Sequence, residues 1–173
     1  MNGLMQDHPL LISSLIKSAE RLNGDVEVVS RRVEGDVHRY TWKDVAARAR
    51  RVANALDRLG LEDAARLATI AWNGYRHLEL YYGVSGSGKV LHTINPRLHT
   101  SQVTWIINHA EDRVVCFDAT FLPLVQQVHA QCSGVRQWVM LCDPERLPRD
   151  SGIPGLVSYE RWIGEASDEY DWP

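Results

Sequence analysis

The chain has 173 residues, of which 45% are hydrophobic and 24% charged, and these fractions are ordinary for a soluble globular protein. Its 19 Lys and Arg against 22 Asp and Glu give a formal net charge of −3, which offers no support for a nucleic-acid binder with a basic excess. No apolar run approaches the roughly 18 residues of a membrane span, and the amino terminus lacks the basic and apolar regions of a secretory signal.

The first part of the chain predicts a helix, a hairpin and a second helix. Apolar residues recur at helical spacing behind Pro9 and stop at Asn23-Gly24. Glu34-Gly35-Asp36 between two extended runs is typical of a hairpin turn. Thr41, followed by Asp44, resembles a capping box that opens the next helix. The expected elements are a helix over 11–22, strands over 26–29 and 37–40, and a helix over 45–59.

From residue 67 onwards, continuous apolar runs alternate with helical stretches. Such runs are typical of strands covered on both faces, and the alternation predicts a parallel sheet with right-handed crossovers. The expected fold class is therefore α/β, a partial doubly wound, mostly parallel sheet with flanking helices, preceded by an amino-terminal helix and β-hairpin. The expected strands are 67–71, 90–94, 114–117 and 138–141, and the expected helices are 75–86, 100–110, 122–131 and one that begins at Ser158, with a surface linker over 143–155.

One motif suggests phosphate binding. Residues 83–89 satisfy GxxxxGK, but a phosphate loop needs a strand before it and a Ser or Thr after the Lys. A helix is expected before these glycines, and Val90 follows Lys89. The simpler interpretation is that the glycines close a helix and let it pack tightly before a strand.

Other residues that could carry chemistry have structural explanations. His92 in an expected strand is typical of a hydrogen-bonded core imidazole. Asp112 lies close to His109 in sequence, and an exposed or helix-ending pair accounts for both. A basic cluster on the polar side of one helix is most simply a solvated face. Its members are Arg48, Arg50, Arg51 and Arg58.

The three cysteines, Cys116, Cys132 and Cys142, are odd in number and have no CxxC spacing. This argues against a disulfide framework or a zinc site and favours a reducing compartment, the cytoplasm. The residues alone therefore single out no catalytic, cofactor-binding or metal-binding side chain.

Two loops are candidates for ligand contact. Trp72 and Asn73 follow the first buried strand, and Asn95, Pro96 and Arg97 follow the second. Open α/β sheets place ligand crevices at the carboxyl ends of their strands. A structural turn explains the two loops equally well.

Five segments follow one another at spacings that resemble a known family. Together they are similar to the amino-terminal part of the adenylate-forming enzymes, and among these to the fatty-acyl-CoA synthetases, which are long- and medium-chain acid–CoA ligases. The resemblance extends from about Leu10 to Trp172. It implies a parent enzyme that uses ATP, magnesium and CoA to convert a fatty acid into acyl-CoA, AMP and pyrophosphate. The segments are residues 40–45, 66–73, 88–98, 106–110 and 114–118.

The chain also departs from the family pattern. Family members usually have Gly-Asp-Arg before the first buried strand, whereas Asp63-Ala64-Ala65-Arg66 lacks the glycine. Lys89 stands where the family usually has Ala, so a long cation must extend towards solvent or strain the joint between helix and strand. The family's phosphate loop, adenine-binding motif, ribose-binding acid and carboxy-terminal lysine have no match here. By resemblance, none of the adenylating residues lies in this chain.

The leading hypothesis is an amino-terminal fragment of a cytoplasmic fatty-acid–CoA ligase that is inactive by itself. Residues 1–41 would form a helix-and-hairpin unit with a possible homodimer contact, and residues 42–173 the first part of the large domain, truncated before the phosphate loop. The alternatives are a stand-alone, non-catalytic binding or dimerisation module on the same scaffold, and a small nucleotide kinase that uses GxxxxGK. Expected partners are a second copy, the remainder of the ligase and, for the parent enzyme, a fatty acid; no nucleic acid or transmembrane segment is expected.

Overall fold

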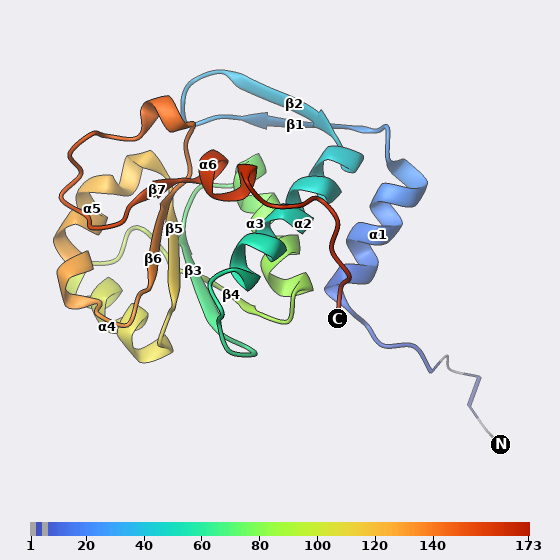
Figure 1. Ribbon diagram of the computed structural model, residues 1–173, viewed down its shortest axis with the longest axis horizontal. Coiled ribbons are helices and arrows are strands. Elements are labelled where there is room, and N and C mark those ends of the chain that lie inside the picture. Colours follow the sequence, from blue (N-terminus) through green and yellow to red (C-terminus); the bar gives the residue numbers. More distant parts are fainter. Residues whose placement is uncertain (1–2, 5–6) are drawn as a thin grey trace.

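The structure is a computed structural model that describes residues 3–4 and 7–173. Residues 1–2 and 5–6, which belong to the expected unit 1–41, lie outside the described residues. Figure 1 shows a sheet covered by helices on both faces, with α1 at one end of the molecule and the β1–β2 hairpin along one margin. In the described part of the chain, no helix is long and apolar enough to cross a membrane.

The elements follow the expected order closely. Gly35 turns the hairpin with a φ of +100°, a conformation that favours glycine. The expected capping box opens α2, because the Thr41 amide donates to Asp44 Oδ2 at 2.8 Å and the Asp44 amide donates to Thr41 Oγ1 at 3.4 Å. In chain order the helices and strands are α1 (Ile12–Asn23), β1 (Glu27–Arg31), β2 (Val37–Thr41), α2 (Trp42–Asp57), β3 (Arg66–Ile70), α3 (Tyr75–Gly86), β4 (Val90–Thr93), α4 (Thr100–Ala110), β5 (Val114–Phe117), α5 (Leu122–Val128), β6 (Gln137–Met140), β7 (Val157–Ser158) and α6 (Tyr159–Gly164).

The main sheet has five strands in the order β4-β3-β5-β6-β7, and every neighbouring pair is parallel. The doubly wound α/β prediction is therefore confirmed, with the two-residue strand β7 as an unexpected addition. From β3 the chain moves outward to β4 and then returns to β5 on the other side of β3. This reversal places the topological switch point of the sheet between β3 and β5.

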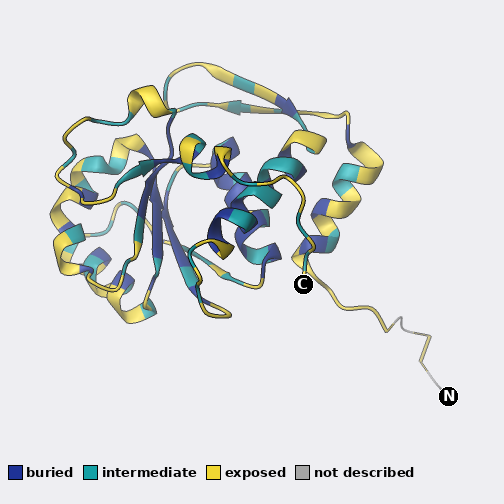
Figure 2. Ribbon diagram, viewed as in Figure 1, coloured by how far each residue is buried: buried dark blue, intermediate teal, exposed yellow. Residues whose placement is uncertain are grey.

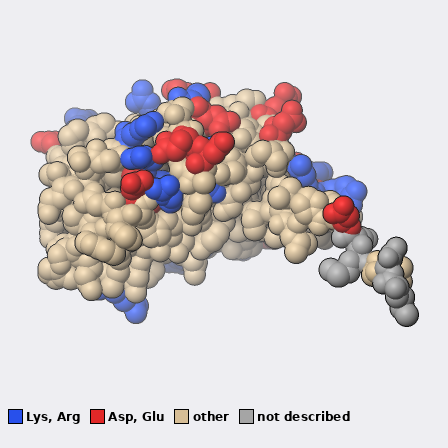
Figure 3. Space-filling view, turned by 90° about the horizontal axis from the view of Figure 1, so that it is seen from below, with Lys and Arg blue, Asp and Glu red and all other residues tan. Residues whose placement is uncertain are grey.

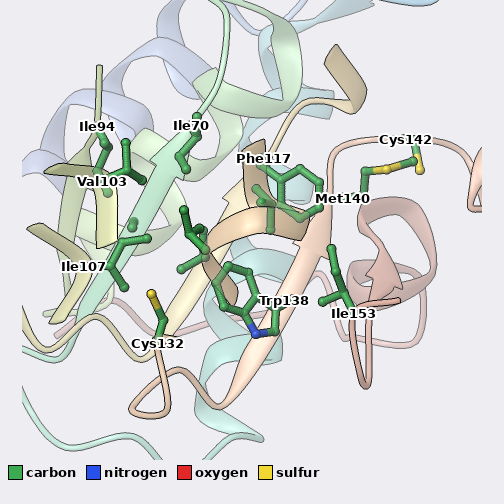
Figure 4. Packing of buried hydrophobic residues seen from close by; sticks show 14 residues of the cluster. Ile70, Ile94, Val103, Ile107, Phe117, Cys132, Trp138, Met140, Cys142 and Ile153 are labelled. Carbon is green, nitrogen blue, oxygen red and sulfur yellow. The ribbon is translucent and has the colours of Figure 1, made fainter. Parts of the chain in front are cut away.

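The central strands β3, β5 and β6 are buried on both faces, as Figure 2 shows by their dark colour, whereas the edge strand β4 is partly exposed. Along β5, Val115 and Phe117 belong to a cluster with α4 and α5, whereas Val114 and Cys116 belong to a cluster with α2, α3 and α6. The alternation follows from the two-residue period of a strand. Figure 4 shows the first cluster, in which Phe117 and Trp138 from neighbouring strands contribute to the same layer as Ile107 of α4.

A third cluster joins the amino-terminal elements to the helical layer. Ile16 of α1 is 1% exposed and packs in a group with Tyr40 of β2, Val45 of α2 and Tyr75 of α3. The opposite face of α1 carries exposed leucines, with Leu15 57% and Leu22 67% exposed. An amphipathic helix is thereby docked by one side and open on the other.

The segment after α6, residues 165–173, lies along α2 and is called the strap here. Three side chains at four-residue spacing, two in α2 and one at the residue that caps it, donate to main-chain carbonyls in and just before the strap. The donors are Arg50 to Asp168 at 2.6 Å, Asn54 to Ser167 and Glu169 at 2.8 Å each, and Arg58 to Glu165 at 3.2 Å and Trp162 at 3.0 Å. Near its end, Trp172 packs so closely on α3 that a Cβ at Gly86 would lie 2.6 Å from the indole.

These contacts overturn the prediction of a solvated basic face. Arg50 also donates to both carboxylate oxygens of Glu20 in α1, at 2.9 Å each, and Arg48 donates to Glu79 at 2.8 Å. Helical spacing identified the polar side of α2, but the groups that cover this side come from distant parts of the chain. Elsewhere, the face in Figure 3 shows side chains of both charge signs close together.

Candidate functional site

Two loops meet at the switch point of the sheet. The carboxyl end of β3 leads into Trp72 and Asn73, and the carboxyl end of β5 leads into Asp118. The Trp72 amide donates to Asp118 Oδ2 at 2.6 Å, and the Asp118 amide donates to the Ile70 carbonyl at 3.1 Å. These hydrogen bonds tie the loops together at the place where doubly wound folds hold ligands.

The β1–β2 hairpin lies over this edge and leaves only a small hollow beneath it. The hollow is about 30 Å³, enough for no more than a few water molecules. Its walls include Trp72, Asn73 and Asp118 from the switch point and Arg32 and Glu34 from the hairpin. In this chain the crevice is therefore largely filled by the chain's own side chains.

A wider groove of about 330 Å³ runs between β1 and α3. Val28, Val29 and Tyr81 give it an apolar lining, and Asn73 and His77 border both the groove and the hollow. The Trp72–Asn73 loop therefore lies between a small hollow bordered by charged side chains and an apolar surface groove.

Arg76 holds the hairpin against the carboxyl edge. Its side chain is 5% exposed and donates to Glu34 at 2.8 Å, to Asp143 at 2.7 Å and to Glu160 at 2.8 Å. Burial acts to raise the pKa of Glu34, but hydrogen bonds from Arg32 and Arg76 outweigh it and lower the pKa to about 2. One buried cation thus joins the hairpin, α3, the loop after β6 and α6.

A second buried ion pair lies deeper in the same layer. Glu79 of α3 is fully buried, accepts from Arg48 of α2 at 2.8 Å and accepts from the Tyr159 hydroxyl at 2.8 Å. Burial raises the pKa of Glu79. Arg48 also donates to Glu160, so the two arginine centres share one carboxylate.

The Trp72 side chain is 44% exposed, and its ring lies against Phe121 with centroids 5.2 Å apart. Its carbonyl accepts from the Gly74 amide at 2.9 Å and lies 3.2 Å from His77 Nδ1. Because a carbonyl only accepts, Nδ1 carries the proton, and His77 Nε2 accepts from the Thr69 hydroxyl at 3.0 Å. Both polar groups of the Trp72 backbone are therefore fixed.

The structure separates the two loops proposed from sequence. Trp72 and Asn73 border the hollow at the switch point. Asn95, Pro96 and Arg97 follow β4 on the far side of β3, where Asn95 Oδ1 accepts from the Arg97 amide at 3.0 Å and closes a turn. Their contact with a ligand remains a prediction for both loops.

Sequence reasoning did not single out Asp118, Arg76 or Glu34. Asp118 had a usable signal, since an acidic residue that directly follows a buried apolar strand lies at the carboxyl edge. Arg76 and Glu34 had none, because 42 residues separate them and no local pattern relates them.

The GxxxxGK segment has the order expected for packing, with α3 before it and β4 after it. A Cβ at Gly83 would lie 2.6 Å from Val52 Cβ, so this glycine permits close contact of α3 with α2. The Lys89 side chain is only 8% exposed, so most of it is buried, and its Nζ lies 4.0 Å from the exposed carboxylate of Asp63. These residues form no phosphate cradle.

His92 is the hydrogen-bonded imidazole that was expected, and its partner is Asp112, with Nδ1 2.9 Å from Oδ2. The pairing of Asp112 with His109 is thus not observed, and His109 stacks instead on Trp105 at 4.4 Å. All three cysteines are free and buried. Among the described residues, no three His, Cys, Asp or Glu side chains gather in a way that could hold a metal ion.

Comparison with known proteins identifies strong relatives. The family model described as "AMP-binding enzyme" matches residues 15–162. A medium-chain-fatty-acid–CoA ligase of Ectopseudomonas oleovorans is 47% identical over all of this chain, which covers 32% of that ligase. A 3-methylmercaptopropionyl-CoA ligase of Ruegeria lacuscaerulensis is 48% identical with the same coverage of both chains. A long-chain-fatty-acid–CoA ligase of Thermus thermophilus is 41% identical over 95% of this chain and 29% of its own length.

Solved structures support the fold. The anthranilate CoA ligase AuaEII, solved with anthranoyl-AMP, superposes with a TM-score of 0.80 at 18% identity, over 98% of this chain and 30% of that one. A putative long-chain-fatty-acid CoA ligase from Rhodopseudomonas palustris gives a TM-score of 0.77 at 22% identity, over 97% and 39%. The chain spans about a third of the length of the curated relatives it matches.

Proposed function

Because the chain belongs to the AMP-binding enzyme family, we propose that it forms the amino-terminal part of an ATP-dependent fatty-acid–CoA ligase. The observation that carries this proposal is the 47% identity to a medium-chain ligase over all 173 residues. The whole ligase would convert a carboxylate, ATP and CoA into acyl-CoA, AMP and pyrophosphate. ATP, magnesium and CoA are the groups that it would use.

Neither the hollow at the switch point nor the GxxxxGK segment offers a cradle for the phosphates of a nucleotide. The hollow at the switch point is about 30 Å³, far smaller than a nucleotide, and the GxxxxGK segment lies between a helix and a strand. Adenylation needs charge stabilisation around the α-phosphate. We therefore assign adenylation to residues outside this chain. To this chain we assign the scaffold of the domain and, through Trp72 and Asn73, part of the lining of the hollow at the switch point.

ATP–pyrophosphate exchange in the presence of a fatty acid tests the assignment. The purified 173-residue chain should show no exchange above a no-protein blank. The full product of the coding region, purified the same way, should exchange and form acyl-CoA. Robust exchange by the short chain would contradict the assignment of adenylation to residues outside it. Absence of ligase activity from the full product would contradict the proposed function.

The acid substrate has two candidates of different chemistry. The relatives of 47% and 48% identity are named for medium-chain fatty acids and for 3-methylmercaptopropionate, respectively. Because the two identities are nearly equal, both a medium-chain fatty acid and a short thioether acid are candidate substrates of the full ligase. Comparing kcat/KM of the full ligase for octanoate and for 3-methylmercaptopropionate decides between them.

We propose that residues 1–41 act as a homodimer contact and that residues 42–173 form the first part of the large domain. The support is the uncovered face of α1, on which Ile12 is 44%, Leu15 57% and Leu22 67% exposed. Apolar patches of this kind favour association. Light scattering after size exclusion should give a dimer for the wild type and a monomer for Leu15→Glu/Leu22→Glu. Lys17→Glu, a charge change at another exposed position of α1, should leave the dimer intact.

A cytoplasmic location is proposed for the parent enzyme, because three free, buried cysteines suit a reducing compartment. Cell fractionation with an antibody to the chain tests it. The stand-alone module gains no support from the comparisons, since the curated relatives reported above are all named as ligases. The structure argues against a nucleotide kinase, because a phosphate loop follows a strand and opens a helix, whereas here α3 precedes the GxxxxGK segment and β4 follows it.

A further inference from the structure

Asp118 has a buried carboxylate with few hydrogen-bond donors and no ion-pair partner among the described residues. It is 7% exposed, and the hydrogen bonds of the described residues give its carboxylate one donor, the Trp72 amide at 2.6 Å. A buried carboxylate is usually satisfied by several donors or by an ion pair. Asp118 therefore carries a desolvation cost that movement of its neighbours could relieve.

The charged groups that face the hollow do not neutralise Asp118. Arg76 of α3 acts on it electrostatically, but the Arg76 nitrogens already donate to Glu34, Asp143 and Glu160. Burial raises the pKa of Asp118 to about 6 against the effects of the Trp72 amide and Arg76, and Glu34 adds to the rise. The other titratable side chains around the hollow are Arg31, Arg32, Glu34, Tyr75, Arg76 and His77.

His77 does not supply the missing positive charge. Its ring is held between the Trp72 carbonyl and the Thr69 hydroxyl, an arrangement that suits the neutral tautomer. Burial also lowers the pKa of His77. The Trp72 loop is thus held on one side by a neutral imidazole and on the other by a titratable carboxyl.

We propose that the Trp72–Asn73 segment is a pH-sensitive gate, closed over the hollow when Asp118 is neutral and released when Asp118 ionises. Movement of the segment would bring an ionised Asp118 into fuller contact with water, whereas a neutral carboxyl still accepts from the Trp72 amide through its carbonyl oxygen. Opening would join the hollow to the groove beside α3. This device acts in the chain itself and does not depend on the proposed ligase function.

The direction of the pH effect follows from linkage. Asp118 takes up a proton more readily in the closed state than in an open, hydrated state, where its pKa would return towards 3.8. Protonation therefore favours closure, and the open fraction should rise as the pH rises from 4 through 6. A difference of about two pKa units allows at most about a 100-fold change in the ratio of open to closed forms.

Hydrogen exchange of the Trp72 amide tests the gate. Its protection factor, which corrects for the intrinsic pH dependence of exchange, should fall at least tenfold between pH 4.5 and pH 7.5 in the wild type. Asp118→Asn keeps an acceptor and cannot ionise, so its protection should stay high and constant. Asp63→Asn changes a fully exposed carboxylate and should retain the wild-type profile.

A carbon-13 titration of the Asp118 carboxyl provides a second measurement that does not rely on a variant. A midpoint near pH 6, shared by the Trp72 amide shift, supports the gate. A midpoint near pH 4, a flat protection profile in the wild type, or an unchanged fall in Asp118→Asn overturns it. Far-ultraviolet circular dichroism at each pH confirms that the measured chain is folded.

Discussion

The imidazole of His92 in β4 lies against the buried carboxylate of Asp112, with Nδ1 2.9 Å from Oδ2 and 3.0 Å from Oδ1. The two residues meet across β3, where the small side chain of Ala68 is the register partner of His92. Burial raises the pKa of Asp112, and the imidazole opposes this effect. The pair links β4 to the start of β5, although these strands are not neighbours in the sheet.

Replacing His92 by Leu should destabilise the protein by about 3 kcal/mol at pH 7, because Asp112 is left buried without its partner. The loss should shrink as the pH falls, since a protonated Asp112 is neutral and a raised pKa means that protonation favours the folded state. Urea unfolding at pH 7 and pH 4.5 measures this. In the Asp112→Asn background the same His92→Leu change should cost much less; equal costs in both backgrounds would show that the pair is not coupled.

Arg76→Met should cost about 3–5 kcal/mol, because three carboxylates lose their shared buried cation. The matched control is Arg39→Met, which removes a pair with Glu27 in which the two side chains are 61% and 52% exposed. Exposed pairs contribute about 1 kcal/mol or less. Similar losses of unfolding free energy for the two variants would contradict the central role of Arg76.

Glu34 should contribute to resistance against acid. The folded-state pKa of about 2 lies below the ordinary value of 4.5, so its stabilisation is present above about pH 4.5 and is lost as the pH falls towards 2. Glu34→Gln should therefore be less stable than the wild type at pH 7, with a smaller difference at pH 3. Asp36→Asn, at a side chain 62% exposed in the same turn, should show a small difference at both pH values.

Ala64→Gly should stabilise the fold by about 1 kcal/mol. Ala64 has a φ of +56°, in the left-handed region where an L-residue with a Cβ is strained by about 1–2 kcal/mol. Glycine removes this strain, but its greater conformational freedom in the unfolded state offsets part of the gain. Ala65→Gly, next in the chain and 1% exposed, should lower stability by about 1 kcal/mol, and thermal unfolding of both variants should shift in opposite directions.

Local signals explain why most elements could be predicted. The capping box of Thr41 and Asp44, the turn at Gly35 and the apolar run of β3 each lie within a few residues. The two-residue strand β7 could not be found in this way, because two residues show no periodicity. Its pairing with β6 is set by the sheet that forms around it.

The candidate site was predictable only in part. Trp72 and Asn73 could be placed at a carboxyl edge because the strand before them is evident in the sequence. The filling of that edge by Arg76, Glu34 and Asp143 depends on contacts 42 and 67 residues apart along the chain. The Arg48 and Arg50 partners were misjudged for the same reason, since helical periodicity reveals a polar face but not what covers it.

The strap is held in place through hydrogen bonds to its main chain. Arg50, Asn54 and Arg58 donate to carbonyl oxygens, which every amino acid supplies. The segment can therefore accumulate substitutions in its outward side chains without losing its place on α2. Insertions and deletions are different, because one residue more or fewer would move every carbonyl away from its donor and shift Trp172 from its seat on Gly86. The attachment of this segment to α2 therefore depends more on its length than on the identity of its outward side chains.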